Sequence, residues 1–183
     1  MDQADTQIEK LSRMLGAFTE EQDADAAVAL LLRVANQHLE VLFVKRVEQS
    51  TDPWSGQMAL PGGKREAKES LRQTVIRETL EETGIDLLHG CRILGVLKTT
   101  TSGVKPEIRV LPCVILLEHQ PLINLSKKEL ERFAWIPIKE LINHKRTAKF
   151  SFGEFPAYVV GNDIIWGMTY RIIENLLCTL EKP

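Results

Sequence analysis

Three glutamates spaced at i, i+3 and i+4, Glu78, Glu81 and Glu82, are the residues of this sequence best placed to do chemistry. On a helix of 3.6 residues per turn they fall within an arc of roughly 100° on one face. Carboxylates at i and i+4 weaken an isolated helix by roughly 0.2–0.5 kcal/mol per pair. A solvated helix gains nothing from this crowding, whereas Mg²⁺ prefers oxygen ligands and pairs carboxylates with substrate phosphates. The spacing therefore indicates a site for hard divalent cations, the alternative being a solvated acidic helix face.

The stretch over residues 60–86, LPGGKREAKESLRQTVIRETLEETGID, surrounds these glutamates with further constrained positions. It resembles the Nudix box of the Nudix hydrolases, Gx5Ex7REUxEExGU, in which U is a bulky aliphatic residue. The one departure is Thr79 at the first aliphatic position, where a β-branched residue of similar bulk stands. The box covers residues 63–85, and its fixed positions are Gly63, Glu69, Arg77, Glu78, Glu81, Glu82, Gly84 and Ile85.

The resemblance implies a role for each charged residue of the box. Glu78, Glu81 and Glu82 would bind Mg²⁺ or Mn²⁺, with the backbone carbonyl of Gly63 as a further ligand. The cations would neutralise a diphosphate and activate a water molecule. Glu78 is the box residue most expected to influence that activation, and Arg77 is expected to hold Glu81 in place.

The same resemblance leaves two roles open for each of two further acids. Glu69 either supports the metal as a further ligand or brace, or is a helix-start acid favoured by the helix dipole. Glu129 precedes FAWIPIKEL, which resembles the acidic loop and strand late in many Nudix sequences. It could activate water or bind substrate, the alternative being a solvated loop glutamate.

Substrate contacts are expected outside the box. Lys45 and Arg46 end a strand where family members often place phosphate-facing cations, although they equally fit an exposed strand end. Trp54 and the loop 99–103, with Thr101 and Gly103, could border the substrate. Stacking of Trp54 on a base is chemically sensible, but a half-buried packing role fits equally well.

The box specifies the chemistry and not the group attached to the diphosphate. Three flanking stretches resemble those of coenzyme A diphosphatases: LFVKR followed by GQMALPGG, then TSGVKPEIRVLPCV, then NDIIWGMTYRIIENLL. Leu60 departs from their phenylalanine before PGG, and DPWS replaces their leucine-arginine-histidine segment. Coenzyme A or a related ADP-containing compound is therefore favoured, while ADP-ribose, another nucleoside diphosphate sugar and NADH stay open. A non-catalytic nucleotide-binding module is disfavoured because such modules typically lose box glutamates.

The composition agrees with an enzyme that acts on a small molecule. A length of 183 residues fits one domain with a sizeable core, and the net charge of −2 gives no reason to expect nucleic-acid or membrane binding. The three cysteines are odd in number and no CxxC occurs, which favours a reducing compartment. The sequence shows no signal peptide and no apolar run approaching a membrane span. We therefore expect a cytoplasmic protein with a nucleoside diphosphate substrate, and a homodimer stays open.

Hydrophobic periodicity predicts mixed helices and strands. Amphipathic helices are expected over 4–18 and 164–180. The box helix should begin near Leu71, after a Ser70 and Gln73 capping box, and end at Gly84. Its apolar side, Ile76 and Leu80, is expected to pack on a sheet. Strands are predicted at 26–34, 39–47, 57–60, 92–98 and 108–117, a strand and short helix across 127–143, and a hairpin at 149–160 that turns at or near Gly153.

The Nudix resemblance implies how these elements assemble. It predicts an α/β fold, an α/β/α sandwich with a mixed sheet, over a single domain spanning residues 1–183. An extra N-terminal helix within residues 1–20 and a C-terminal helix complete the expected architecture.

Overall fold

The computed structural model describes residues 3–19, 21–48, 55–103 and 107–182 of the chain. In these ranges the helices are α1 (Gln3–Met14), α2 (Leu71–Thr83), α3 (Ile138–Asn143) and α4 (Gly167–Glu181). The strands are β1 (Ala26–Ala35), β2 (His38–Arg46), β3 (Met58–Ala59), β4 (Gly62–Lys64), β5 (Cys91–Val96), β6 (Thr100–Thr101), β7 (Arg109–Leu117), β8 (Leu130–Pro137), β9 (Lys145–Phe150), β10 (Gly153–Val160) and β11 (Asp163–Trp166). None of the helices in the described ranges is both long and apolar enough to cross a membrane.

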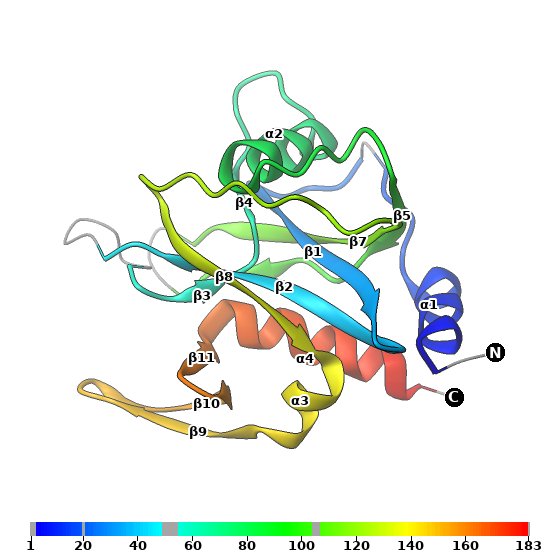
Figure 1. Cartoon of the computed structure of the whole chain (residues 1–183). Coiled ribbons are helices and arrows are strands. Elements are labelled where there is room, and N and C mark those ends of the chain that lie inside the picture. Colours follow the sequence, from blue (N-terminus) through cyan, green and yellow to red (C-terminus); the bar gives the residue numbers. More distant parts are fainter. Residues whose placement is uncertain (1–2, 20, 49–54, 104–106, 183) are drawn as a thin grey trace.

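The first eight strands form one mixed sheet, whose central order is β3-β2-β1-β7-β5 (Figure 1). β4 pairs with β1, β6 with β7, and β8 with β2. β1 and β7 run parallel, with Ala26 opposite Val110, and the other pairs are antiparallel. Neighbouring parallel strands need a crossover connection, and the segment that joins β1 to β7 contains α2. The box helix therefore lies between the two central strands in the sequence.

Alternation along β1 divides the apolar interior into two layers. Leu31 faces a core that includes Val75 of α2, whereas Leu30 faces a core that includes Leu11 of α1 and Ile173 of α4. Figure 1 accordingly shows α2 on one side of the sheet and α4 on the other. The predicted α/β fold, with a mixed sheet and helices at both ends, is confirmed.

The opening hairpin is confirmed, and its turn has a defined cause. Ala35 pairs with His38, so that Asn36 and Gln37 make a two-residue turn. Both turn residues have positive φ, 48° and 64°. Two-residue turns of this kind match the right-handed twist of the strands they join.

In the last part of the chain, the C-terminal helix begins later than the sequence predicts. The hairpin over 149–160 is confirmed, because Phe150 pairs with Gly153 and the turn falls just before Gly153. The predicted start of the last helix at residue 164 is wrong, because Asp163–Trp166 form β11, which pairs with β10. β9, β10 and β11 together form a second, three-stranded sheet. The helix begins only at Gly167, whose φ of 62° lets the chain turn out of the strand.

The N-terminal helix is shorter than the periodicity predicts. It ends at Met14 because Gly16 pairs with β5, donating to the Val96 carbonyl at 3.2 Å and accepting from the Val96 N–H at 2.9 Å. Phe18 then packs against the α2 side of the sheet and not against the core that Leu11 joins.

Candidate active site

Local sequence fixes both ends of the box helix. The Ser70 hydroxyl accepts from the Gln73 N–H at 3.2 Å, and the Gln73 side chain accepts from the Ser70 N–H at 2.8 Å. At the other end Gly84 adopts φ 72°, and its N–H donates to the Leu80 carbonyl at 2.8 Å. The predicted capping box and C-terminal glycine are therefore confirmed, and they set which residues of α2 face the sheet.

The face of α2 that packs on the sheet differs in part from the prediction. Ile76 is partly buried against the core, as expected. Leu80, however, is 47% exposed, so its predicted packing on the sheet is wrong. Thr79 and Thr83 are fully buried in its place, because the inward stripe runs through Leu71 and Val75 to these threonines.

Glu82 is the most buried of the three box glutamates. Its residue is 3% exposed, and its Oε2 accepts a hydrogen bond from the Gly62 N–H at 2.9 Å. Burial raises the pKa of Glu82 to about 7, with the charges of Glu78 and Glu129 acting in the same direction. The Gly62 hydrogen bond and the charge of Arg46 oppose the shift.

Glu78 lies half-buried against the glycine loop. A side chain at Gly63 would overlap the Glu78 carboxylate, so this glycine lets the loop backbone approach the acid closely. Burial raises the pKa of Glu78, and the charges of Glu81 and Glu129 add to that effect while Arg77 opposes it. Glu78 and Glu82 therefore both lie where a cation would stabilise their charged forms.

Arg77 joins the carboxylates of the box. Its Nε donates to Glu69 Oε1 at 2.9 Å, and its Nη1 donates to Glu78 at 2.9 Å and to Glu81 at 3.2 Å. Its Nη2 also donates to the Lys64 carbonyl at 3.3 Å. The expected contact with Glu81 is present, but Glu81 is the most exposed of the three partners.

Glu69 is surrounded by hydrogen-bond donors. Besides Arg77, its Oε2 accepts from the Thr74 hydroxyl at 2.9 Å and the Glu66 N–H at 3.0 Å. The hydrogen bond from Arg77, followed by those from Glu66 and Thr74, lowers the pKa of Glu69 to about 2 against a smaller opposing effect of burial. This arrangement fits the predicted brace, and a direct role of Glu69 as a metal ligand stays a prediction.

Two predicted residues outside the box, Glu129 and Arg46, act on these acids through their charges. The charge of Glu129 raises the pKa of both Glu78 and Glu82, and the charge of Arg46 lowers that of Glu82. The Glu129 carbonyl accepts from the Val47 N–H at 2.9 Å, which ties the start of β8 to the end of β2. Their charges therefore reach the box glutamates, and the roles of Glu129 and Arg46 in catalysis and binding stay predictions.

Three of the remaining predicted substrate residues, Lys45, Thr101 and Gly103, lie in the described ranges, and the contacts of Lys45 and Thr101 there are to residues outside the box. Lys45 lies next to Arg46 on β2, where the register with β8 shifts, and its Nζ is paired with Glu131 at 2.9 Å. Thr101 is exposed in β6, and its carbonyl accepts from Arg171 of α4 at 2.6 Å. Gly103 is exposed with open space around it, and Trp54 lies outside the described residues. Their roles in binding stay predictions.

Comparison with known protein families shows to which family this chain belongs. The family model described as NUDIX domain matches residues 23–157. The chain belongs to the NUDIX family. The resemblance carried by residues 63–85 is thereby confirmed.

Two curated relatives show how far the similarity extends. Peroxisomal coenzyme A diphosphatase ndx-8 of Caenorhabditis elegans is 29% identical over 136 residues, which cover 73% of this chain and 57% of that protein. An uncharacterized protein of Schizosaccharomyces pombe is 38% identical over 108 residues, covering 56% of this chain and 33% of that protein. The chain thus spans less than two thirds of the length of each of these relatives.

Solved structures confirm the fold. The MutT protein from Methanosarcina mazei Go1 aligns with a TM-score of 0.60 at 20% identity, covering 90% of this chain and 100% of that one. An Ap4A hydrolase of C. elegans, solved as a binary complex, aligns with a TM-score of 0.55 at 21% identity, covering 66% and 85%. At such identities the likeness shows the Nudix fold alone.

Nudix hydrolases generally use divalent metal ions, and the donor set of this box fits them. Glu78, Glu81, Glu82 and the carbonyl of Gly63 offer oxygen ligands only, which suit Mg²⁺ and Mn²⁺. In the part of the chain that the structure describes, no three acidic, histidine or cysteine side chains already surround one point. The contacts above explain this, because Arg77 draws Glu78 and Glu81 while Gly62 holds Glu82.

Sequence reasoning missed the part that Gly62 plays in this Nudix site. Gly62 has φ 144°, and a side chain there would overlap the Ala27 carbonyl and the Val28 backbone. Its N–H can therefore reach Glu82 only because the residue is glycine. Two consecutive glycines, Gly62 and Gly63, were the available signal for this role of Gly62. The motif, however, assigns a role to Gly63 alone.

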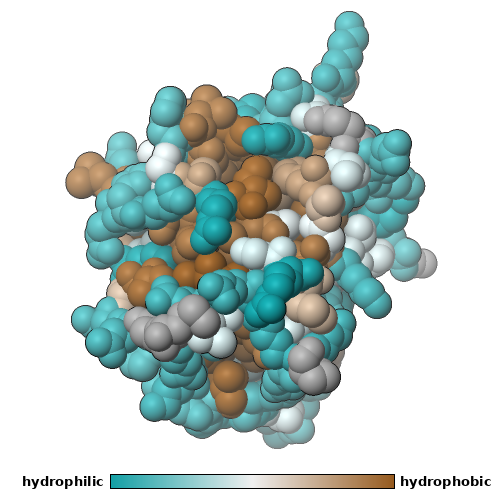
Figure 2. Space-filling view, turned by 90° about the vertical axis from the view of Figure 1, so that its right-hand side faces the viewer, coloured by the Kyte–Doolittle hydropathy of each residue, from teal (hydrophilic) through white to brown (hydrophobic). Residues whose placement is uncertain are grey.

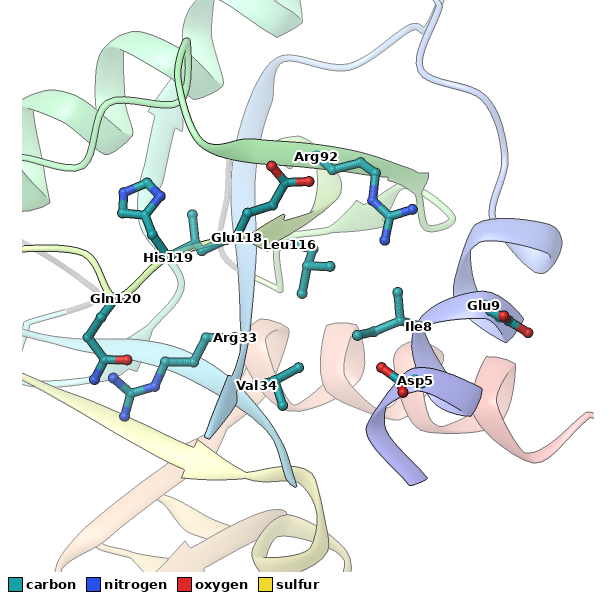
Figure 3. Close-up of a pocket in the computed structure, with 11 residues that line it drawn as sticks. Asp5, Ile8, Glu9, Arg33, Val34, Arg92, Leu116, Glu118, His119 and Gln120 are labelled. Atoms are coloured by element: carbon teal, nitrogen blue, oxygen red, sulfur yellow. The ribbon is translucent and has the colours of Figure 1, made fainter. Parts of the chain in front are cut away.

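A hollow of about 640 Å³ lies away from the Nudix box, beside α1. Figure 2 shows this face of the molecule, with hydrophobic residues in its middle and hydrophilic residues around them. Ile8, Val34 and Leu116 converge on the hollow, and Asp5 and Arg92 lie at its rim (Figure 3). None of its lining residues belongs to the box, so this hollow is separate from the candidate active site.

Proposed function

We propose that this protein hydrolyses the diphosphate linkage of a nucleoside diphosphate derivative, with Mg²⁺ or Mn²⁺ as its cofactor. The observation that carries the proposal is the almost fully buried Glu82, which the Gly62 N–H holds at 2.9 Å and on which the charges of Glu78, Glu129 and Arg46 act. Buried acids near one another are costly to ionise unless a cation offsets their charge. A metal-bound diphosphate supplies positive charge to the carboxylates and negative charge to Arg46.

Each residue of the site would contribute to attack of water at phosphorus. When bound, a divalent cation neutralises the diphosphate and lowers the pKa of a coordinated water. Glu78 or Glu129 would accept the proton of the attacking water, and Arg46 would face the phosphate charge. Arg77 and Gly62 would keep Glu78 and Glu82 in orientation, as neighbours of metal ligands generally do.

Coenzyme A or a related ADP-containing compound is the favoured substrate. The support is the likeness to a relative named as a peroxisomal coenzyme A diphosphatase, together with the three flanking stretches quoted above. Hydrolysis of coenzyme A would give 3′,5′-ADP and phosphopantetheine. ADP-ribose or another nucleoside diphosphate sugar is the alternative, because Leu60 and the DPWS segment depart from the coenzyme A pattern.

A nucleotide-binding module without activity is a weaker alternative. The chain keeps every glutamate of the box, and Arg77 still joins Glu69, Glu78 and Glu81 in one network. A module released from catalysis would have no need of this network. A cytoplasmic location, a single domain over 1–183 and a homodimer stay predictions.

The proposal is tested by incubating the purified protein with Mg²⁺, and separately with Mn²⁺, against a panel of diphosphate compounds. The panel holds coenzyme A, acyl-coenzyme A, ADP-ribose, GDP-mannose, UDP-glucose, NADH and nucleoside triphosphates, with products identified by mass. Preferred turnover of coenzyme A to the two products above supports the proposal in full. Activity spread over the nucleotide sugars keeps the reaction and overturns the coenzyme A assignment, and no turnover of any compound favours the binding module.

A further inference from the structure

Three aromatic rings line a hollow of about 540 Å³ between the small sheet and the edge of the large one. The rings belong to Phe150, Phe152 and Trp166, and the facing wall includes Lys45 of β2 and Met58 of β3. β11 contacts β3, so the two sheets meet here (Figure 1). The mechanism described above makes no use of this hollow.

Phe150 and Phe152 are stacked, Trp166 packs against both at a tilt, and the Phe152 side of the cluster faces water. The centroids of Phe150 and Phe152 lie 5.4 Å apart with the ring planes 14° from parallel, and Trp166 lies 4.6 Å from Phe150. Phe152 is 64% exposed. An exposed ring that is held in a stack beside a hollow offers a preformed surface for another flat ring.

The charges around the hollow cancel one another. Lys45 is paired with Glu131 at 2.9 Å, and Arg132 is paired with Asp163 at 3.2 Å. A phosphate would have to displace Glu131 or Asp163 to bind these cations. The paired charges therefore favour a neutral, planar group over an anion.

The hollow is close along the chain to the candidate active site. Lys45 lines it, and the next residue on β2, Arg46, acts on Glu82. The hollow and the candidate active site therefore both adjoin the end of β2. Met58 also lines the hollow, and the chain runs from there through β3 to Gly62, which binds Glu82.

We propose that this aromatic hollow binds the nucleobase of the substrate whose diphosphate lies at the box glutamates. The inference rests on the proposed function, because it assigns one end of the same substrate. Base–aromatic stacking tolerates any base and depends on ring area, which fits the mostly exposed Phe152. The affinity of the enzyme for the nucleoside half of its substrate would then come from β9–β11, without selection among the bases.

Binding is tested without catalysis, in EDTA, by ligand-observed NMR with adenosine 5′-monophosphate. Ribose 5-phosphate serves as the control ligand, because it lacks the base. Phe152→Ala should bind adenosine 5′-monophosphate about tenfold more weakly, within the range for the loss of one base–aromatic stack. Phe152→Tyr should keep the wild-type affinity. Ile142→Ala removes another exposed apolar side chain, on α3, and should leave binding unchanged.

Steady-state kinetics with coenzyme A, or with ADP-ribose if coenzyme A is not cleaved, supply the second readout. Phe152→Ala should raise KM about tenfold with kcat kept, since the reacting atoms are not touched. Unchanged binding of adenosine monophosphate in Phe152→Ala overturns the inference even where the protein hydrolyses its substrate. Phe152-dependent binding without any hydrolysis upholds the hollow and overturns the proposed function. A changed oligomeric mass in Phe152→Ala, with binding and KM unaltered, assigns the rings to a protein interface and also overturns it.

Discussion

The backbone N–H of Gly62 donates to the carboxylate of Glu82 at 2.9 Å, although the two residues lie 20 positions apart in the sequence. The bond links the first residue of β4 to the last turn of the box helix. It leaves Glu82 buried among acids, where its charge is poorly tolerated without a cation. The stability of the protein and its affinity for metal should therefore both depend on Glu82.

The first prediction concerns the pH dependence of stability without metal. Glu82 has its pKa raised to about 7, so between pH 4.5 and 7 the folded state binds more protons than the unfolded state. The contribution of Glu82 to stability is thus present below its unfolded pKa and is lost as pH rises through 7. The loss is roughly 3 kcal/mol at most, by the size of the shift.

Urea unfolding at pH 5.5 and pH 8 in EDTA measures this contribution. Glu82→Gln, which stays neutral, should lose stability less steeply with rising pH than the wild type. Addition of Mg²⁺ at pH 8 should restore stability to the wild type and not to Glu82→Gln. Identical pH profiles for the two proteins would show that Glu82 ionises normally.

A second prediction follows from the conformation of Gly62. Gly62→Ala should destabilise the fold by roughly 2 kcal/mol or more, because φ is 144° and the new side chain would overlap the Ala27 carbonyl. Gly103→Ala is the matched control, since nothing lies near that position, and should change stability by less than about 0.5 kcal/mol. Thermal unfolding of the three proteins decides the matter, and equal losses in both variants would refute the steric account.

The third prediction concerns Thr79. Its hydroxyl is buried and has no hydrogen-bond partner among the described residues. Thr79→Val keeps the shape and removes the unpaired group, so it should stabilise the protein by about 1 kcal/mol. Thr74→Val should do the opposite, because the Thr74 hydroxyl donates to Glu69 at 2.9 Å. Chemical denaturation measures both, and a loss of stability in Thr79→Val would mean that its hydroxyl has a partner.

The fourth prediction concerns Arg77 as a positioning residue. Arg77→Lys keeps one charge but cannot donate to Glu69, Glu78 and Glu81 at once. Metal affinity or kcat should fall by about 10- to 100-fold, as for other neighbours of metal ligands. Activity measured against Mn²⁺ concentration checks this, with Arg72→Lys, an exposed position on the same helix, as the control. Wild-type metal dependence in Arg77→Lys would contradict the role.

Much of the fold could be predicted from local signals. The capping box at Ser70, the glycine at 84 and the order of helices and strands follow from side-chain chemistry and periodicity, which act over a few residues. The helix predicted from residue 164 failed because Ile164 and Ile165 continue a helical pattern of apolar residues. Pairing with β10 overrides that preference, and pairing is a tertiary effect.

The residues of the site could be predicted from the sequence, but the differences in burial and contacts among them could not. In the sequence Glu78, Glu81 and Glu82 look alike, and only the packing of α2 against segments distant in the sequence makes Glu82 buried and leaves Glu81 exposed. Lys45 and Arg46 likewise look like one basic pair. In the structure Lys45 lines the aromatic hollow and pairs with Glu131, whereas Arg46 acts on Glu82, and neither contact could be predicted from the sequence.

The most direct test of the account is the turnover of coenzyme A and ADP-ribose with Mg²⁺ by the wild type and by Glu82→Gln, with the fold checked by circular dichroism. The account predicts metal-dependent hydrolysis by the wild type and a loss of about 100-fold or more in a well-folded Glu82→Gln. Equal activity in the two proteins would contradict it, because Glu82 would then neither bind the metal nor shape the site.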